Sequence, residues 1–134
     1  MKIVVYTDGA ARGNPGPAGA GGLLLDPEGA VLGEVSAYLG EMTNNQAEYR
    51  ALLLTLHRAH ELGATEIHIF ADSELMVKQL NGVYRVKNAD LKPLFQETVQ
   101  QLQKFKQYTI QHLFREKNKR ADQLANRAID EHVL

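Results

Sequence analysis

The sequence predicts an α/β fold in which helices pack on a mixed β-sheet. Two observations lead to this prediction. Residues 2–40 contain three strand-like segments joined by turn sequences, and from residue 43 onwards helical segments alternate with two further strand-like segments. The chain has 134 residues, of which 44% are hydrophobic and 23% charged. These proportions suit one hydrophobic core, so we expect residues 1–134 to form a single domain.

The first three strands are expected to form an antiparallel meander. Residues 2–7 are an apolar, β-branched run, which is typical of a strand buried on both faces. A loop rich in Gly and Pro follows at 13–19. Further strands are expected at about 19–26 and 30–40, and Asp26-Pro27-Glu28-Gly29 predicts the hairpin turn between them.

The second part of the chain predicts helices separated by two strands. Thr43-Asn44-Asn45-Gln46 has the residue pattern of a capping box, and a helix is expected from about 44 to 62 with Gly63 as its C-cap. Residues 65–71 alternate as a strand does and lead into a helix that begins at Ser73. After a turn at Asn81-Gly82, the pattern predicts a helix near 90–105 with Pro93 in its first turn, a strand at 108–114 and a helix at about 119–131.

Composition excludes several classes of protein. No apolar run approaches the roughly 18 residues that cross a bilayer, and residues 1–8 do not resemble a signal peptide. We therefore expect a soluble, cytoplasmic protein, acting as a monomer and away from membranes. Cysteine is absent, so any metal would be bound by oxygen or imidazole. Residues 1–75 carry a net charge of −6 and residues 76–134 a net charge of +5, which suits separate cation-binding and polyanion-binding regions or reflects chance variation on solvated faces.

Four carboxylates are candidates for a functional site. Asp8 and Asp72 are expected at the ends of strands, where loops of an α/β sheet open and ligands collect. Each could equally be a turn former or a helix cap. Glu48 is expected in the first turn of its helix, where the alternative role is a favourable interaction with the helix dipole. Asp122 shares the inward stripe of the last helix with Ala125 and Ile129, and burying an unpaired acid there is costly.

If these four acids converge, their negative charges require cations. Converging carboxylates raise one another's pKa unless a cation neutralises them. Oxygen ligands favour Mg²⁺ or Mn²⁺, and two such ions about 3.5–4 Å apart would act on a phosphodiester. Spacing along the chain does not establish that the acids meet.

Five motifs together resemble those of ribonuclease H type 1, in the order and spacing of that family and over nearly the whole chain. They are Thr7-Asp8-Gly9-Ala10, Gly13-Asn14-Pro15-Gly16-Pro17, Thr43-Asn44-Asn45-Gln46-Ala47-Glu48, Ala71-Asp72-Ser73 and Asn118-Lys119-Arg120-Ala121-Asp122-Gln123-Leu124-Ala125. The resemblance implies a five-stranded mixed sheet, with three antiparallel strands followed by two parallel ones, flanked by helices. It also implies endonucleolytic cleavage of the RNA strand of an RNA/DNA hybrid, leaving 5′-phosphate and 3′-hydroxyl ends.

The resemblance assigns roles to individual residues. Asp8, Glu48, Asp72 and Asp122 match the metal-binding acids of the family. Gly9 matches a position whose backbone lies against the substrate, and Thr43 matches a hydroxyl that binds a DNA phosphate. Asn14, Asn44 and Asn45 match residues that contact the minor groove, where an amide can both donate and accept hydrogen bonds. Turn formation and helix capping are the alternative roles of the three asparagines.

The sequence departs from the family pattern in two places. Only residues 82–88 stand where larger members carry a basic helix with tryptophans. Hybrid binding would then depend on other cations, or these are ordinary solvated charges; the candidates are Arg85, Lys87, Lys117, Lys119 and Arg120. Residues 114–118 lack the histidine found in many members. His112 is expected to pack in its strand and Glu116 is a weaker substitute, so we predict little dependence on an acid/base side chain.

Two other functions stay open at this stage. One is a non-catalytic module that binds hybrids, and the other is a different nuclease on the same scaffold. The complete set of four acids favours an enzyme. The Asn44-Asn45 pair and the Gly13-Asn14-Pro15-Gly16 loop favour ribonuclease H.

Overall fold

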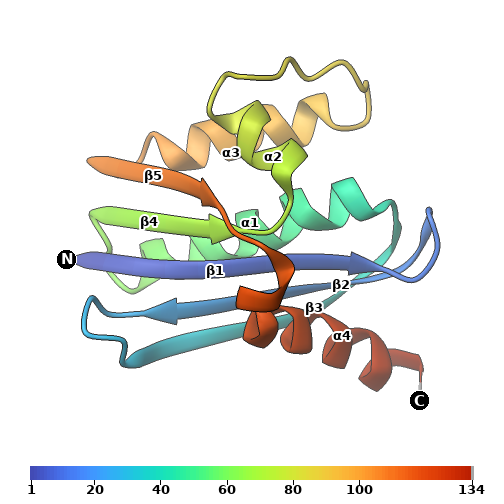
Figure 1. Ribbon diagram of the computed structural model, residues 1–134, viewed down its shortest axis with the longest axis horizontal. Helices are drawn as coiled ribbons and strands as arrows, with labels where there is room; N and C mark the ends of the chain where they lie inside the picture. Colours follow the sequence, from blue (N-terminus) through green and yellow to red (C-terminus); the bar gives the residue numbers. More distant parts are fainter. Residues whose placement is uncertain (134) are drawn as a thin grey trace.

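A five-stranded mixed sheet forms the centre of the computed structural model, which describes residues 1–133 (Figure 1). The strand order is β3-β2-β1-β4-β5. β1 pairs antiparallel with β2, and β2 with β3, whereas β1–β4 and β4–β5 are parallel. The strands are β1 (Lys2–Ala11), β2 (Gly16–Leu25), β3 (Val31–Met42), β4 (Glu66–Ala71) and β5 (Gln107–His112). The predicted sheet of three antiparallel and two parallel strands is confirmed.

In the described part of the chain, four α-helices flank the sheet. They are α1 (Asn44–Glu61), α2 (Glu74–Leu80), α3 (Lys92–Leu102) and α4 (Lys119–Val133), and a short 3₁₀ helix η1 (Arg115–Lys117) precedes α4. α1 contacts β1 and β2 and also packs against α3, while α4 contacts β1, β2 and β3 (Figure 1). Within residues 1–133, no helix combines the length and the apolar character needed to cross a membrane.

Two adjacent glycines of β2 explain how α1 and α4 cover opposite faces of the sheet. A Cβ on Gly21 would overlap the Ala121 carbonyl of α4. A Cβ on Gly22 would instead overlap the Thr55 hydroxyl of α1. Because successive strand residues point to opposite faces, the two helices lie on either side of β2. The missing side chains allow both helices to approach the strand closely.

The main hydrophobic core fills the space between the sheet and the helices α1, α2 and α3. It combines the inward residues of β1 and β4 with the apolar stripe of α1. Fully buried members of this core are Ile3, Val5, Leu24, Leu52, Leu56, Ile67 and Ile69. The capping box predicted for α1 is also confirmed, since the Thr43 side chain accepts from the Gln46 N–H and the Gln46 side chain accepts from the Thr43 N–H.

Three expected positions are wrong by a few residues. β1 continues to Ala11 because it pairs with β2 as far as Ala11↔Ala18, so Asp8 lies inside this strand rather than at its end. α1 begins at Asn44, which places Glu48 in the second turn rather than the first. β5 ends at His112, and Phe114 lies outside the strand with 71% of its surface exposed.

Candidate functional site

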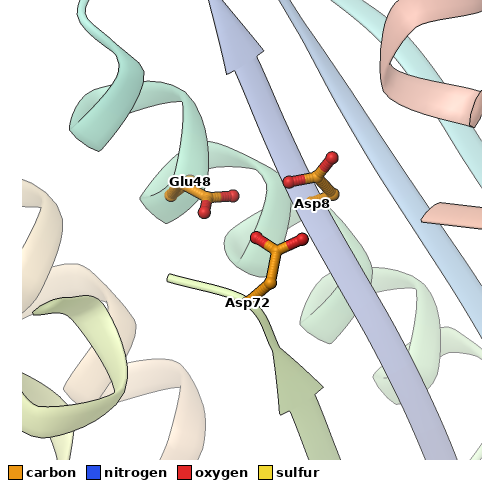
Figure 2. Close-up of side chains that lie close together, drawn as sticks. All are labelled: Asp8, Glu48 and Asp72. Carbon is orange, nitrogen blue, oxygen red and sulfur yellow. The ribbon is translucent and has the colours of Figure 1, made fainter. Parts of the chain in front are cut away.

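Three of the candidate acids meet beside the carboxyl end of β4. Asp8 lies in β1, Asp72 directly follows β4, and Glu48 lies on α1, and Figure 2 shows the three carboxylates facing one another. One oxygen from each lies within 4.8 Å of the other two. Asp8 and Glu48 are 3% and 4% exposed, and Asp72 is half-buried. The predicted convergence is therefore confirmed for these three acids.

The pairing of β1 with β4 positions two of these acids. The last pair of the parallel register is Thr7↔Ala71, so Asp8 in β1 and Asp72 after β4 are the residues that follow this pair. The edge at which parallel strands end is where an α/β sheet opens to ligands. The sheet register therefore brings Asp8 and Asp72 together although they are 64 positions apart in the printed sequence.

Gly9 brings Glu48 into the same site. Its main-chain N–H donates a hydrogen bond to the Glu48 carboxylate. A Cβ on Gly9 would overlap the carbonyl group of Ala47, so the missing side chain lets α1 lie against β1. The resemblance implied that this glycine permits close approach of the substrate. The close approach present in the structure is that of α1.

The three acids carry more negative charge than their surroundings support. Burial, together with the negative charges of Glu48 and Asp72, raises the pKa of Asp8 to about 10. Burial, followed by the charge of Asp72, raises the pKa of Glu48 to about 8, against the opposing effect of the Gly9 N–H. Asp8 Oδ2 is buried without a hydrogen-bond partner among the described residues. An orphaned, buried carboxylate oxygen beside two further acids fits a divalent cation.

Asp122 lies next to this group but outside it. After burial and the charges of Glu48 and Asp72, the nearby Asp122 carboxyl also contributes to the raised pKa of Asp8. The Asp122 side chain is 33% exposed; its Oδ1 accepts from Asn126 Nδ2 at 3.2 Å and lies 3.6 Å from Arg115 Nη2. The structure thus brings three of the four acids together and places the fourth beside Asp8, and the role of Asp122 as a metal ligand stays a prediction. Asp122 is only partly buried on the inward stripe of α4, and Asn126 and Arg115 contact its carboxylate.

Arg115 is a residue of this site that sequence reasoning missed. Its side chain is 76% exposed, and it lines a hollow of about 230 Å³ together with the three acids. The other lining residues of this hollow are Gly9, Asn44 and Ser73. Among residues 114–118 the candidates chosen from the sequence were Glu116 and Lys117, and no signal in the sequence distinguished Arg115 from these neighbours.

A second, polar hollow of about 180 Å³ lies at the start of α1. It is lined by Asn14, Thr43, Asn44, Asn45, Gln46, Asn88, Asp90 and Leu91. The Asn44 N–H donates to Asn14 Oδ1 at 3.1 Å, which joins the Gly/Pro-rich loop to the helix start. Asn44 lines both hollows, so the polar hollow adjoins the acidic site. The four polar residues chosen from the sequence, which are Asn14, Thr43, Asn44 and Asn45, therefore line one hollow. The sequence did not predict that Asn88 and Asp90 also line it.

The remaining candidates divide by location. Arg120 Nε lies 2.6 Å from Glu34 Oε2, so the positive charge of this guanidinium is balanced by an ion pair within the protein. Lys117 lines a different hollow beside Tyr6, and Arg85 lines one beside Phe95. Lys87, Lys119 and Glu116 are exposed. His112 is half-buried at the end of β5, and its ring makes an edge contact with Phe114 at 5.6 Å, in agreement with a packing role.

The fold and the acidic cluster together define a class of nucleic-acid-processing domains. Residues 6–128 match the family model described as reverse transcriptase-like. The chain is 35% identical over 147 aligned residues to ribonuclease H of Pseudomonas putida, covering 97% of this chain and 95% of that protein. The chain therefore belongs to the ribonuclease H family.

Solved structures agree with this assignment. The crystal structure of RNase H1 from Halobacterium salinarum superposes with a TM-score of 0.96 at 40% identity, covering 98% of this chain and 99% of that one. LC11-RNase H1 in complex with an RNA/DNA hybrid gives a TM-score of 0.94 at 44% identity, covering 98% and 99% of the two chains. The curated ribonuclease HI of H. salinarum is 40% identical over 130 residues, and the alignment covers 97% of this chain but only 65% of the length of that relative.

Proposed function

We propose that this chain is an endoribonuclease that cleaves the RNA strand of RNA/DNA hybrids and leaves 5′-phosphate and 3′-hydroxyl ends. The observation that carries the proposal is the group of three acids beside the carboxyl end of the inner strand β4 of the ribonuclease H fold. One carboxylate oxygen of each acid lies within 4.8 Å of the other two. The hybrid bound to LC11-RNase H1, which is 44% identical, supports the substrate class.

Two divalent cations, Mg²⁺ or Mn²⁺, are the proposed cofactors. Asp8, Glu48 and Asp72 would hold them, with Asp122 contributing beside Asp8. The unpartnered Asp8 Oδ2 and the raised pKa of Asp8 and Glu48 support this fit. When bound, such ions activate water for attack and stabilise the negative charge that develops on the phosphodiester.

The side chains of the chain itself hold this site in place. The Gly9 N–H orients the Glu48 carboxylate, and Asn118 donates to Asp72 Oδ2. Arg115 adds a positive charge at the rim of the acidic hollow, where a guanidinium suits a phosphate group. No histidine lines this hollow among the described residues, and we propose that turnover depends only weakly on an acid/base side chain there.

Hybrid recognition is assigned to the polar hollow beside the acids. Asn14, Asn44 and Asn45 would contact the minor groove, where an amide can pair with both 2′-hydroxyls and base edges. Thr43 would contact a DNA phosphate, and the backbone of Gly9 would lie against the strand that is cut. Phosphate contacts do not read sequence, so binding should be nearly independent of sequence and should weaken with salt. Among the basic candidates, the ion pair with Glu34 makes Arg120 the least suited.

Cleavage assays with labelled duplexes test this proposal. We expect the protein to cut the RNA strand of RNA/DNA, to leave DNA/DNA intact, and to lose activity in EDTA, and an RNA/RNA duplex tests whether a DNA strand is required. Asp8→Asn should abolish cleavage while hybrid binding is retained. Binding without cleavage in both Mg²⁺ and Mn²⁺ would indicate a non-catalytic module, and cutting of DNA/DNA would indicate a different nuclease. Mapping of the product ends tests for the 5′-phosphate.

A further inference from the structure

Asn118 stands at the start of α4 but does not cap this helix. Its main-chain carbonyl accepts the first helical hydrogen bond, from the Asp122 N–H at 3.1 Å. The side-chain oxygen of an asparagine at this position usually accepts from an N–H of the first helical turn. Here Asn118 is 1% exposed, and its Oδ1 has no hydrogen-bond partner among the described residues. A buried amide oxygen left unpaired is unfavourable, so the side chain is oriented by something other than the helix.

The amide nitrogen of Asn118 accounts for this orientation. Nδ2 donates to the Thr7 carbonyl at 2.8 Å and to Asp72 Oδ2 at 3.2 Å. Rotating the amide by half a turn would place Oδ1 against these two oxygens, so the neighbouring acceptors determine which way the group points. The amide nitrogen donates to two acceptors at the acidic site, and the side-chain oxygen does not cap α4.

Both side-chain hydrogen bonds of Asn118, and the one that its carbonyl accepts, end at segments that carry one of the acids, whereas its main-chain N–H donates to the Arg115 carbonyl at 3.0 Å. Thr7 is the residue before Asp8 in β1, Asp72 is contacted directly, and Asp122 is contacted through its main-chain N–H. Among the described residues, Asn118 is the only N–H donor to the Asp72 carboxylate. The buried side chain of Asn118 thus joins β1 to the residue that follows β4, and its main-chain carbonyl joins both to the start of α4.

We propose that Asn118 is a positioning residue that sets the spacing of Asp8, Asp72 and Asp122 and orients the Asp72 carboxylate toward the cation site. This inference rests on the proposed function. By holding Asp72 Oδ2, the amide restricts rotation of the carboxylate and directs its other oxygen to a cation. Groups that hold metal ligands in this way contribute about 10–100-fold to metal affinity or activity.

The test compares Asn118→Ser with the parent chain. Serine is a favourable N-cap, so the start of α4 is retained, but its side chain is too short to bridge Thr7 and Asp72. We expect Mg²⁺ affinity, measured by calorimetry without nucleic acid, to fall about tenfold or more. The kcat on a hybrid should fall by a similar factor, while KM for the hybrid changes little. Unchanged Mg²⁺ affinity and kcat in folded Asn118→Ser would overturn the inference.

Asn81→Ser is the matched control. Asn81 Nδ2 donates to the Ile110 carbonyl at 3.0 Å, a bond of the same kind that joins α2 to β5 and does not involve an acid. This variant should lower the Tm without changing Mg²⁺ affinity. A double-mutant cycle with Asp72→Asn adds a readout that a merely structural role does not move. If Asn118 acts through Asp72, the losses of Mg²⁺ affinity are not additive, and additive losses would contradict the inference.

Two further measurements keep the test decisive. If Asn118→Ser does not fold, the side-chain amide resonances of Asn118 in the parent chain can be followed by NMR during a Mg²⁺ titration. We expect them to shift with saturation of the site, and resonances unaffected by Mg²⁺ would count against the inference. A parent chain that neither binds Mg²⁺ nor cuts hybrids would refute the proposed function itself. A parent chain that does both, matched by Asn118→Ser, would refute only the role of Asn118.

Discussion

The main-chain N–H of Gly9 donates a hydrogen bond to the carboxylate of Glu48, which joins β1 to α1 at the acidic site. These residues are 39 positions apart in sequence. A Cβ on Gly9 would overlap the Ala47 carbonyl, so a missing side chain and a hydrogen bond act together at this point. The packing of α1 on the sheet and the position of a candidate metal ligand therefore depend on the same glycine.

Gly9→Ala should lower both stability and activity. The added methyl group forces α1 away from β1, and overpacking of this kind typically costs about 1–3 kcal/mol. Because Glu48 moves with the helix, we also expect hybrid cleavage to fall at least about tenfold, since small misplacements of catalytic groups are costly. Thermal unfolding in EDTA and cleavage in Mg²⁺ measure the two effects.

Gly33→Ala is the control for this prediction. The nearest atom to a Cβ on Gly33 in β3 is Arg58 Nε at 3.7 Å, which is ordinary van der Waals contact. This variant should change stability by less than about 0.5 kcal/mol and leave cleavage unaffected. Equal behaviour of Gly9→Ala and Gly33→Ala would show that α1 adjusts to the extra methyl group without consequence.

Much of the fold follows from local patterns in the sequence. The capping box at Thr43 and Gln46 determined where α1 begins, because reciprocal hydrogen bonds over three residues are encoded locally. The extension of β1 past Asp8 was not visible, since it depends on pairing with the glycine-rich β2 rather than on its own apolar residues. Where a helix or strand ends because of pairing with a distant segment, the hydrophobic pattern of its own residues does not predict that end.

The acidic site shows the same division. Asp8, Glu48 and Asp72 could be chosen from the sequence, and three of the expected residues do meet. Arg115 and Asn118 could not be chosen, because their contacts with Asp122 and Asp72 arise only when α4 packs near the ends of β1 and β4. These contacts depend on how distant segments pack together, and residue spacing along the chain does not predict them.

The metal-free protein should lose stability as the pH rises. In the unfolded chain Asp and Glu have a pKa near 4, whereas in the folded protein the pKa of Glu48 is about 8 and that of Asp8 about 10. The folded state therefore binds more protons between these values, and the free energy of unfolding falls from about pH 4 upward until the acids are ionised. Thermal melts in EDTA from pH 4 to pH 9 measure this trend.

Asp8→Asn isolates the contribution of Asp8 to this pH dependence. At pH 8 Asp8 must take up a proton on folding, because its pKa is about 10 in the folded protein and near 4 in the unfolded chain, whereas Asn is neutral in both states. The variant should therefore raise the Tm in EDTA at pH 8 by about 5 °C, and the difference should shrink toward pH 4, where Asp8 becomes protonated in the unfolded chain as well. Mg²⁺ should reverse the order, because it stabilises the parent chain more than the variant. A variant that melts below the parent in EDTA at pH 8 would contradict the repulsion inferred for the three acids.

Arg115→Ala should weaken cleavage through lost charge at the rim of the acidic hollow. The guanidinium lies 3.6 Å from the Asp122 carboxylate, in position to contact a phosphate. We expect kcat/KM to fall about tenfold, as loss of a hydrogen bond to a charged group predicts. The salt dependence of binding should decrease by about one in log–log slope. Arg115→Lys should recover part of the loss, and a variant with unchanged kcat/KM and salt slope would remove Arg115 from the site.

His112→Ala should leave the pH–rate profile of cleavage as it is in the parent chain. His112 is half-buried at the end of β5 against Phe114, and it does not line the acidic hollow. Turnover measured from pH 6 to pH 9 in saturating Mg²⁺ would show any contribution from its titration. A lower turnover, or a shifted pH profile, would mean that His112 reaches the reacting groups in the complex.

Thr43 combines a structural role with a proposed binding role, and three variants separate the two. Thr43→Ala removes the cap of α1 and the hydroxyl, so we expect a loss of about 1 kcal/mol in stability and a raised KM for hybrids. Thr43→Ser retains the hydroxyl and should resemble the parent chain. Gln46→Ala removes the acceptor for the Thr43 N–H but keeps the Thr43 hydroxyl, so it should lower the Tm with little change in KM. If Gln46→Ala raises KM as much as Thr43→Ala does, the effect on binding comes from the helix start rather than from the hydroxyl.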